Sequence, residues 1–111
     1  MKEIAWVKAA LKDFGDFPQA VQDRMKDALA IAAMGQKADI AKPMKGLGAG
    51  VLEIALPYRT DAYRCVYAVQ LGDRLWVVHA FQKKSTRGIA TPQKEVELIK
   101  YRLKRIEEML R

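Results

Sequence analysis

The sequence predicts a single small α+β domain over residues 1–111, in which helices accompany a three-stranded antiparallel sheet. Three observations support this class. Helical periodicity dominates the N-terminal third of the chain, extended periodicity dominates the middle, and a helical stripe returns near the C-terminus. The length of 111 residues, half of them hydrophobic, suits one compact domain with its own core.

The N-terminal part predicts a strand followed by a pair of helices. Residues 2–7 (KEIAWV) place Ile4 and Trp6 at alternate positions, which indicates a short strand. A brief helix follows, and a second helix extends from about Pro18 to Gly35. The apolar stripe of this second helix consists of Val21, Met25, Ala28, Leu29 and Ala32. We expect the two helices to form an antiparallel pair.

The middle of the chain predicts three antiparallel strands. Residues 35–50 form a loop rich in glycine, after which the pattern becomes extended. The predicted strands are VLEIAL (51–56), AYRCVYAVQL (62–71) and RLWVVHAFQ (74–82). The pair Gly72-Asp73 between the last two is a good signal for a two-residue hairpin turn.

The last segment predicts a helix that docks on the sheet. Thr91 is its expected N-cap and Pro92 its expected first helical residue. Its apolar stripe consists of Val96, Ile99, Leu103, Ile106 and Leu110. Because this stripe spans barely two heptads, docking on the chain's own sheet is favoured over a coiled-coil seam.

Basic residues concentrate in the C-terminal part of the chain. Residues 1–41 hold six Lys/Arg and six Asp/Glu, whereas residues 42–111 hold fourteen and seven. The whole net charge of +7 (14 − 7) therefore arises after residue 41. Such a clustered excess is typical of a protein that binds nucleic acid. A basic surface that merely aids solubility is the alternative.

Several classes are disfavoured by composition. Cys65 is the single cysteine and His79 the single histidine, so no internal disulfide forms and an ordinary His/Cys zinc site is not expected. We expect no cofactor. The longest apolar run, residues 28–34, is far too short to span a membrane, and residues 1–10 lack a secretory signal pattern. We therefore expect a cytoplasmic protein.

The expected hairpin gathers cations at one end of the sheet. With the turn at 72 and 73, five facing pairs are expected, namely Leu71–Arg74, Ala68–Val77, Val66–His79, Arg64–Phe81 and Ala62–Lys83. Arg64, His79 and Lys83 then share one face at the end farthest from the turn. The opposite face is expected to be core, with Tyr63, Cys65, Tyr67, Val69, Trp76, Val78 and Ala80.

These cations suit the cleavage of RNA by the neighbouring 2′-hydroxyl. The arginine fork of Arg64 can bind two phosphate oxygens, and Lys83 can take part in proton transfer. Structural interpretations remain open. Arg64 can form a salt bridge to Glu53 or Asp61, His79 can be a hydrogen-bonded strand residue, and Lys83 with Lys84 can protect a sheet edge from aggregation.

Four segments carry a family resemblance: GLGAGVLEIAL, DAYRCVY, HAFQKKS and GIATPQKEVELIKYRLKR. They resemble the phage-derived branch of the RelE/HigB-type toxins of type II toxin–antitoxin pairs, in the RelE/ParE superfamily. The resemblance runs from about Lys42 to Arg105 and implies the RelE-like α+β fold. It also implies a ribosome-dependent mRNA endonuclease that inhibits translation, with a cognate antitoxin, often of helix-turn-helix type, as partner.

The resemblance assigns roles to individual residues. Arg64 matches the arginine that holds the scissile phosphate. Lys83 and Lys84 match the basic pair that stabilises the transition state or donates a proton. Lys45 and Arg59 match loop positions that are commonly basic, and contacts with RNA or the ribosome are expected from them and also from Lys42 and Arg87. The general base remains open between His79 and Lys83.

The sequence also departs from the family. Glu53 and Ala55 stand where RNA-cutting relatives carry basic residues, and the C-terminus lacks a tyrosine or histidine. Two other functions therefore remain open. One is a ParE-like poison of DNA gyrase that cuts no RNA, and the other is an inactive phage-derived RNA-binding module.

Overall fold

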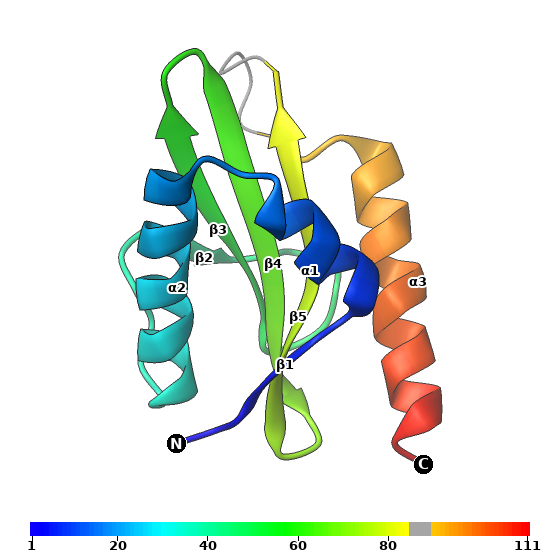
Figure 1. Ribbon diagram of the computed structural model, residues 1–111. Helices are drawn as coiled ribbons and strands as arrows, with labels where there is room; N and C mark the ends of the chain where they lie inside the picture. Colours follow the sequence, from blue (N-terminus) through cyan, green and yellow to red (C-terminus); the bar gives the residue numbers. More distant parts are fainter. Residues whose placement is uncertain (85–89) are drawn as a thin grey trace.

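Residues 1–84 and 90–111 are described by a computed structural model of the chain (Figure 1). Its elements are β1 (Ile4–Trp6), α1 (Lys8–Gly15), α2 (Gln19–Ala33), β2 (Ala41–Pro43), β3 (Val51–Tyr58), β4 (Asp61–Leu71), β5 (Arg74–Lys83) and α3 (Gln93–Met109). The predicted α+β class and all of the predicted helices and strands are confirmed. The structure adds β2, which lies inside the segment predicted to be a loop.

The sheet is larger than predicted. It has five strands in the order β1-β5-β4-β3-β2, so the prediction of a three-stranded antiparallel sheet is wrong in extent and in character. β1 pairs in parallel with β5, and β2 pairs antiparallel with β3. Both edge strands are three residues long, which is too short for an alternating pattern to reveal a pairing partner.

The helices cover both faces of the sheet. On one face α2 packs its stripe against β3 and β4, while α1 crosses β5 obliquely and in roughly the opposite direction to α2, as predicted (Figure 1). On the other face α3 packs Ile99, Leu103 and Ile106 against Val66 and Val78. The α3 stripe therefore docks on the chain's own sheet.

The predicted hairpin register holds at both ends, including Leu71–Arg74 beside the turn, and fails between them. Val66–His79, Arg64–Phe81 and Ala62–Lys83 face each other as predicted, but Ala68 faces Trp76 instead of Val77. The cause is an irregularity at Val78, an extra residue in β5. Trp76 and Val78 therefore lie on the α3 side and not in the core expected for them, whereas Val77 packs on the α1–α2 side.

The start of α3 also differs from the prediction. Pro92 is the N-cap and Gln93 is the first helical residue, whereas Thr91 and Pro92 were expected in these two positions. The helix therefore begins one residue later than predicted. The Thr91 hydroxyl instead donates to Glu53 Oε2 at 2.8 Å. This bond joins the segment before α3 to the middle of β3.

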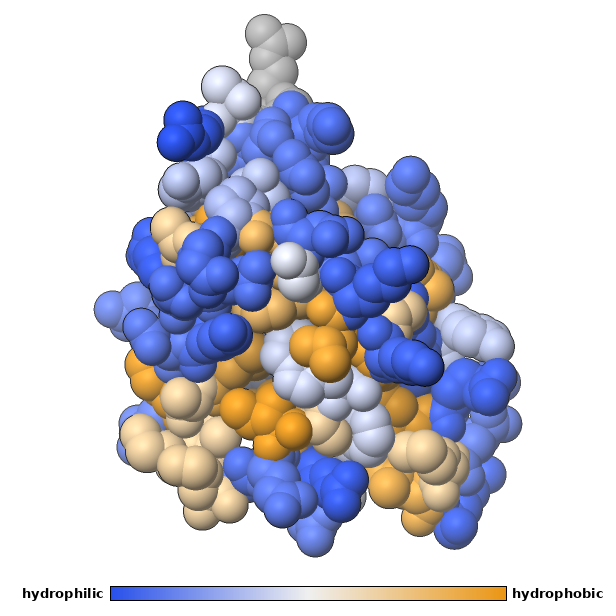
Figure 2. Space-filling view, in the orientation of Figure 1, coloured by the Kyte–Doolittle hydropathy of each residue, from blue (hydrophilic) through white to orange (hydrophobic). Residues whose placement is uncertain are grey.

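The surface is hydrophilic over much of the face that carries α1, and hydrophobic atoms gather in its lower part around β1 (Figure 2). Within the described ranges, no helix combines the length and the hydrophobicity that a membrane crossing requires.

Candidate functional site

The end of the sheet farthest from the β4–β5 turn presents exposed cations. Lys83 closes β5 opposite Ala62, and the exposed Lys84 follows it directly. Arg59 is exposed in the two-residue turn between β3 and β4. Its φ of 59° lies in the left-handed region, and its guanidinium sits 5.4 Å from the centre of the Tyr58 ring. Three of the predicted site residues thus lie at one end of the molecule.

Arg64 lies on the same face of the sheet as Lys83 and is buried, with 6% of its surface exposed. Its Nη1 lies 2.9 Å from Glu53 Oε1, which is one of the two salt bridges that the sequence allowed. Glu53 is also largely buried, and its second oxygen accepts the hydrogen bond from Thr91. A buried carboxylate and a buried guanidinium in contact compensate each other's desolvation.

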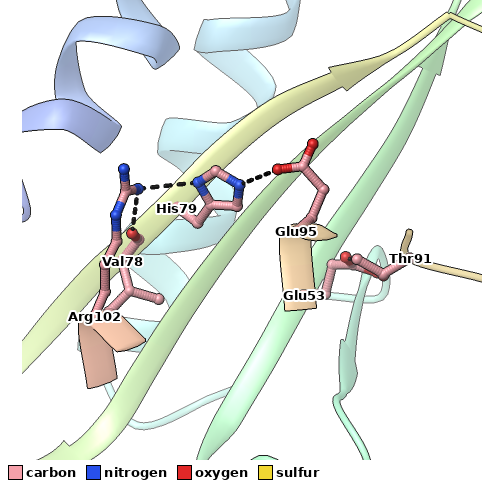
Figure 3. Close-up of polar contacts among 6 residues, drawn as sticks. All are labelled: Glu53, Val78, His79, Thr91, Glu95 and Arg102. Carbon is pink, nitrogen blue, oxygen red and sulfur yellow. Dashed lines mark hydrogen bonds and ion pairs between the residues drawn. The ribbon is translucent and has the colours of Figure 1, made fainter. Parts of the chain in front are cut away.

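His79 is enclosed by two charged residues of α3 (Figure 3). Its Nε2 lies 2.8 Å from Glu95 Oε1, and its Nδ1 lies 3.0 Å from Arg102 Nη1. The same Nη1 donates to the carbonyl of Val78 at 3.0 Å. The ring also stacks on Phe81, with centroids 5.1 Å apart, and His79 is 3% exposed.

The partners of His79 fix its tautomer. A guanidinium has donors and no acceptor, so Nδ1 accepts from Arg102 and the proton resides on Nε2, which donates to Glu95. Both ring nitrogens are therefore engaged inside the protein. In this arrangement no lone pair of the imidazole is available to a substrate, and the geometry favours the structural interpretation of His79.

The remaining predicted residues are spread over the fold. Lys83 Nζ donates to the carbonyl of Ala90 at 3.3 Å, which ties the end of β5 to the segment before α3. Lys42 faces Glu53 from β2 and is exposed. Lys45 is exposed in the loop that leads to β3, at the opposite end of the sheet from Arg59. Arg87 lies outside the described residues.

Two buried groups near the site have raised pKa values. Burial, with a smaller contribution from the charge of Glu53, raises the pKa of the Cys65 thiol from 9.0 to about 12. Burial, followed by interaction with Cys65, raises the pKa of Tyr67 to about 12. Cys65 is fully buried on the α1–α2 side, so the thiol stays protonated at neutral pH and is a poor nucleophile. Across residues 1–84 and 90–111, no three His, Cys, Asp or Glu side chains cluster as metal ligands would.

Sequence reasoning missed the two residues that hold His79. Glu95 and Arg102 are seven positions apart, so they lie on one side of α3, two turns from each other. This spacing, combined with docking of the apolar stripe on the sheet, is a signal that was available in the sequence. The sequence did not reveal which residues of β5 would lie opposite Glu95 and Arg102 of α3.

The architecture defines a class of small α+β proteins with the RelE fold. Two solved structures share it. One is a double arginine-to-alanine mutant of the E. coli toxin RelE in the free state, with a TM-score of 0.63, 18% identity, and coverage of 95% of this chain and 97% of that chain. The other is the isolated E. coli RelE toxin in a P21 crystal form, with a TM-score of 0.60, 20% identity, and coverage of 91% and 98%.

The particular family is shown by sequence. The family described as "Phage derived protein Gp49-like (DUF891)" matches residues 12–104, and the chain belongs to this family. The resemblance to the phage-derived, RelE-like branch is thereby confirmed. No curated protein sequence matches the chain significantly.

Proposed function

We propose that this chain is the toxin of a type II toxin–antitoxin pair and that it cuts mRNA on the ribosome. The observation that carries the proposal is a RelE fold whose sheet ends in Arg59, Lys83 and Lys84, on the side where Glu53 and Arg64 form a buried pair. The exposed Arg59 and Lys84, together with the half-buried Lys83, suit the phosphate backbone of RNA. The proposed partners are mRNA, the ribosome and a helix-turn-helix antitoxin, the proposed location is the cytoplasm, and the mechanism requires no cofactor.

The proposed chemistry assigns the proton transfers to Glu53 and Lys83. The Glu53 carboxylate removes the proton of the 2′-hydroxyl, whose oxygen attacks the adjacent phosphorus. The bond from phosphorus to the 5′ oxygen breaks, and the Lys83 ammonium donates a proton to that oxygen. The products are a 2′,3′-cyclic phosphate and a 5′-hydroxyl, with Glu53 protonated and Lys83 neutral. This assignment replaces His79, because each ring nitrogen has a single site that is already used, whereas each Glu53 oxygen keeps a second lone pair beside its contact with Arg64 or Thr91.

Arg64 has the part of the phosphate ligand in this scheme. Its guanidinium contacts the Glu53 carboxylate at 2.9 Å, and a phosphate that enters beside Glu53 competes for the same fork. The developing charge of the transition state is stabilised by a cation that is already fixed in place. In this scheme Glu53 is the counter-ion of Arg64 in the resting state and the base during the reaction.

The test is to map RNA ends after brief induction in bacteria. We expect growth arrest and new mRNA ends that follow codon boundaries. Glu53→Gln, which keeps the shape of the side chain and removes its basicity, is expected to slow cleavage by about 10² to 10⁴-fold. Arg64→Ala is expected to abolish cleavage. Lys26→Ala, at an exposed position of α2 outside the candidate site, is the matched control and is expected to cut normally.

Two outcomes would contradict the proposal. Normal cleavage by folded Glu53→Gln would remove Glu53 from the mechanism. Arrest with intact mRNA and damaged DNA would point to the gyrase poison instead.

An RNA-binding module without activity is a second candidate, and a specific observation favours it. Arg64 and His79 are both engaged by carboxylates of the chain, and Glu53 occupies a position where RNA-cutting relatives are expected to carry a cation. This candidate predicts no growth arrest and no new RNA ends, but salt-sensitive binding to RNA in vitro. The same induction experiment separates it from the toxin.

A further inference from the structure

A groove of about 550 Å³ lies between β1, the start of β5 and the C-terminal half of α3. Its apolar and aromatic lining consists of Trp6, Val7, Trp76, Tyr101, Ile106 and Met109. Tyr101 is 57% and Met109 61% exposed, so large apolar side chains face solvent here. Figure 2 shows hydrophobic atoms in this region, between β1 and the end of α3. An apolar patch of this kind is typical of a protein-binding surface.

Two arginines form the basic side of the groove. Arg105 Nη1 donates to the Tyr101 hydroxyl at 3.0 Å, and its guanidinium lies 5.8 Å from the centre of the Tyr101 ring. Arg102 uses Nη1 for Val78 and His79, so its Nε and Nη2 can still donate to a partner. Tryptophan, tyrosine, methionine and arginine are the residues that interface centres prefer, and this groove contains all four types.

We propose that this groove docks an acidic amphipathic helix of another protein. Charge selects the partner, because the chain carries a net charge of +7 and the groove is lined by Arg102 and Arg105 without a carboxylate. A second copy of the chain would place these arginines against each other and is disfavoured. From Tyr101 to Met109 the wall formed by α3 is about 12 Å long, which matches two turns of a helix with apolar residues at i, i+3, i+4 and i+7.

The groove is separate from the basic end of the sheet. Its α3 residues belong to the C-terminal half of the helix, whereas Lys83 contacts the segment before the N-terminal end of α3. An occupant of the groove therefore leaves Lys83 and Lys84 uncovered. Under the proposed function the partner is the antitoxin, and that identification, unlike the docking surface itself, rests on the proposed function.

The tryptophans make the groove observable. The chain has two, and both Trp6 and Trp76 line the groove, so intrinsic fluorescence reports on its occupancy. The probe is a helical peptide of about four turns with leucines at i, i+3, i+4 and i+7 and glutamates elsewhere. A matched peptide has lysine in place of every glutamate. We expect the glutamate peptide to shift tryptophan emission and to bind at least about tenfold more tightly than the lysine peptide.

Three variants locate the binding. Met109→Glu, at an exposed position, is expected to weaken the glutamate peptide at least about tenfold, because a carboxylate replaces an apolar anchor. Arg105→Glu is expected to invert the preference, so that the lysine peptide binds better. Lys84→Glu makes the same change of charge as Arg105→Glu, but at the other end of the sheet. This variant is expected to bind the glutamate peptide as tightly as the unmodified chain does.

Several results would overturn the proposal. They are equal affinity for the two peptides, binding that neither groove variant changes, or an unchanged tryptophan signal at saturation. If sedimentation reveals a dimer that Met109→Glu dissociates, the groove is instead the interface with a second copy of the chain. Loss of growth arrest with intact peptide binding contradicts only the proposed function, so the two failures are distinguishable.

Discussion

Replacement of His79 by leucine tests whether the imidazole supports the fold or takes part in chemistry. His79 is 3% exposed and joins β5 to α3 through Glu95 and Arg102. Leucine fills a similar volume and removes both hydrogen bonds. If the geometry describes the role of His79 correctly, the variant loses stability and keeps activity per folded molecule.

The loss of stability can be worked from the two contacts. Hydrogen bonds to charged groups contribute about 1.5–3 kcal/mol each. The lower end applies here, because the Glu95 side chain is 18% exposed and Arg102 is partly exposed, so both can be rehydrated. Two bonds then give about 3 kcal/mol, of which the buried leucine recovers about 1 kcal/mol. We expect a net loss of about 2 kcal/mol, which lowers the melting temperature by about 8 °C.

The assay is urea unfolding at pH 7 followed by circular dichroism, with two companion variants. The Oδ1 atom of His79→Asn can replace Nδ1 and accept from Arg102, whereas the amide of His79→Gln can replace Nε2 and donate to Glu95. Each variant keeps one of the two bonds, so each is expected to cost about half as much as leucine. This ordering is specific to the tautomer that the contacts define.

Two results would refute the reasoning. An unfolding midpoint of His79→Leu equal to that of the unmodified chain would show that the bonds contribute nothing. RNA cleavage lost in His79→Leu at unchanged folded fraction would make the imidazole a catalytic group.

Three further predictions concern other parts of the molecule. The pKa of the Cys65 thiol is raised from 9.0 to about 12, so its contribution to stability is complete below pH 9 and is lost as the pH rises towards 12. Cys65→Ala lacks this thiol and should therefore unfold at a higher pH than the unmodified chain. An alkaline titration followed by circular dichroism measures the difference. Gly50→Ala should destabilise the chain more than Gly48→Ala in urea unfolding. Both glycines have a positive φ, which costs about 1–2 kcal/mol when alanine replaces either. Of the two, only Gly50 would place the new methyl against a neighbour, Gln70 Cγ at 2.7 Å. Lys84→Ala should leave stability unchanged and reduce the salt dependence of RNA affinity by about one phosphate contact, measured by fluorescence anisotropy between low and moderate salt.

Much of the fold was predictable because its longer elements have clear periods. The stripe of α2, the stripe of α3 and the turn at Gly72-Asp73 each specify their element locally. The edge strands were harder, since three residues carry little pattern and their pairing depends on distant segments. The bulge at Val78 was not predictable from alternation, because an extra residue changes which side chains face α3 without changing the composition.

The site was predicted in part for the same reason. The register at the far end of the hairpin placed Arg64, His79 and Lys83 on one face, and the structure agrees. The sequence left their partners open, because salt bridges across the sheet and to α3 depend on tertiary packing. Of the partners, only Glu53 was among the alternatives considered.

The partners change what the site requires. His79 depends on α3 through Glu95 and Arg102, and Arg64 depends on the segment before α3 through Glu53 and Thr91. The sheet therefore supplies the charged groups, and the last helix fixes their positions. Any change that loosens the N-terminal end of α3 removes the support of both groups together, even though no residue of α3 itself is proposed to touch RNA. A loss of activity after such a change would be indirect, and it is separated from a loss of chemistry by measuring cleavage per folded molecule.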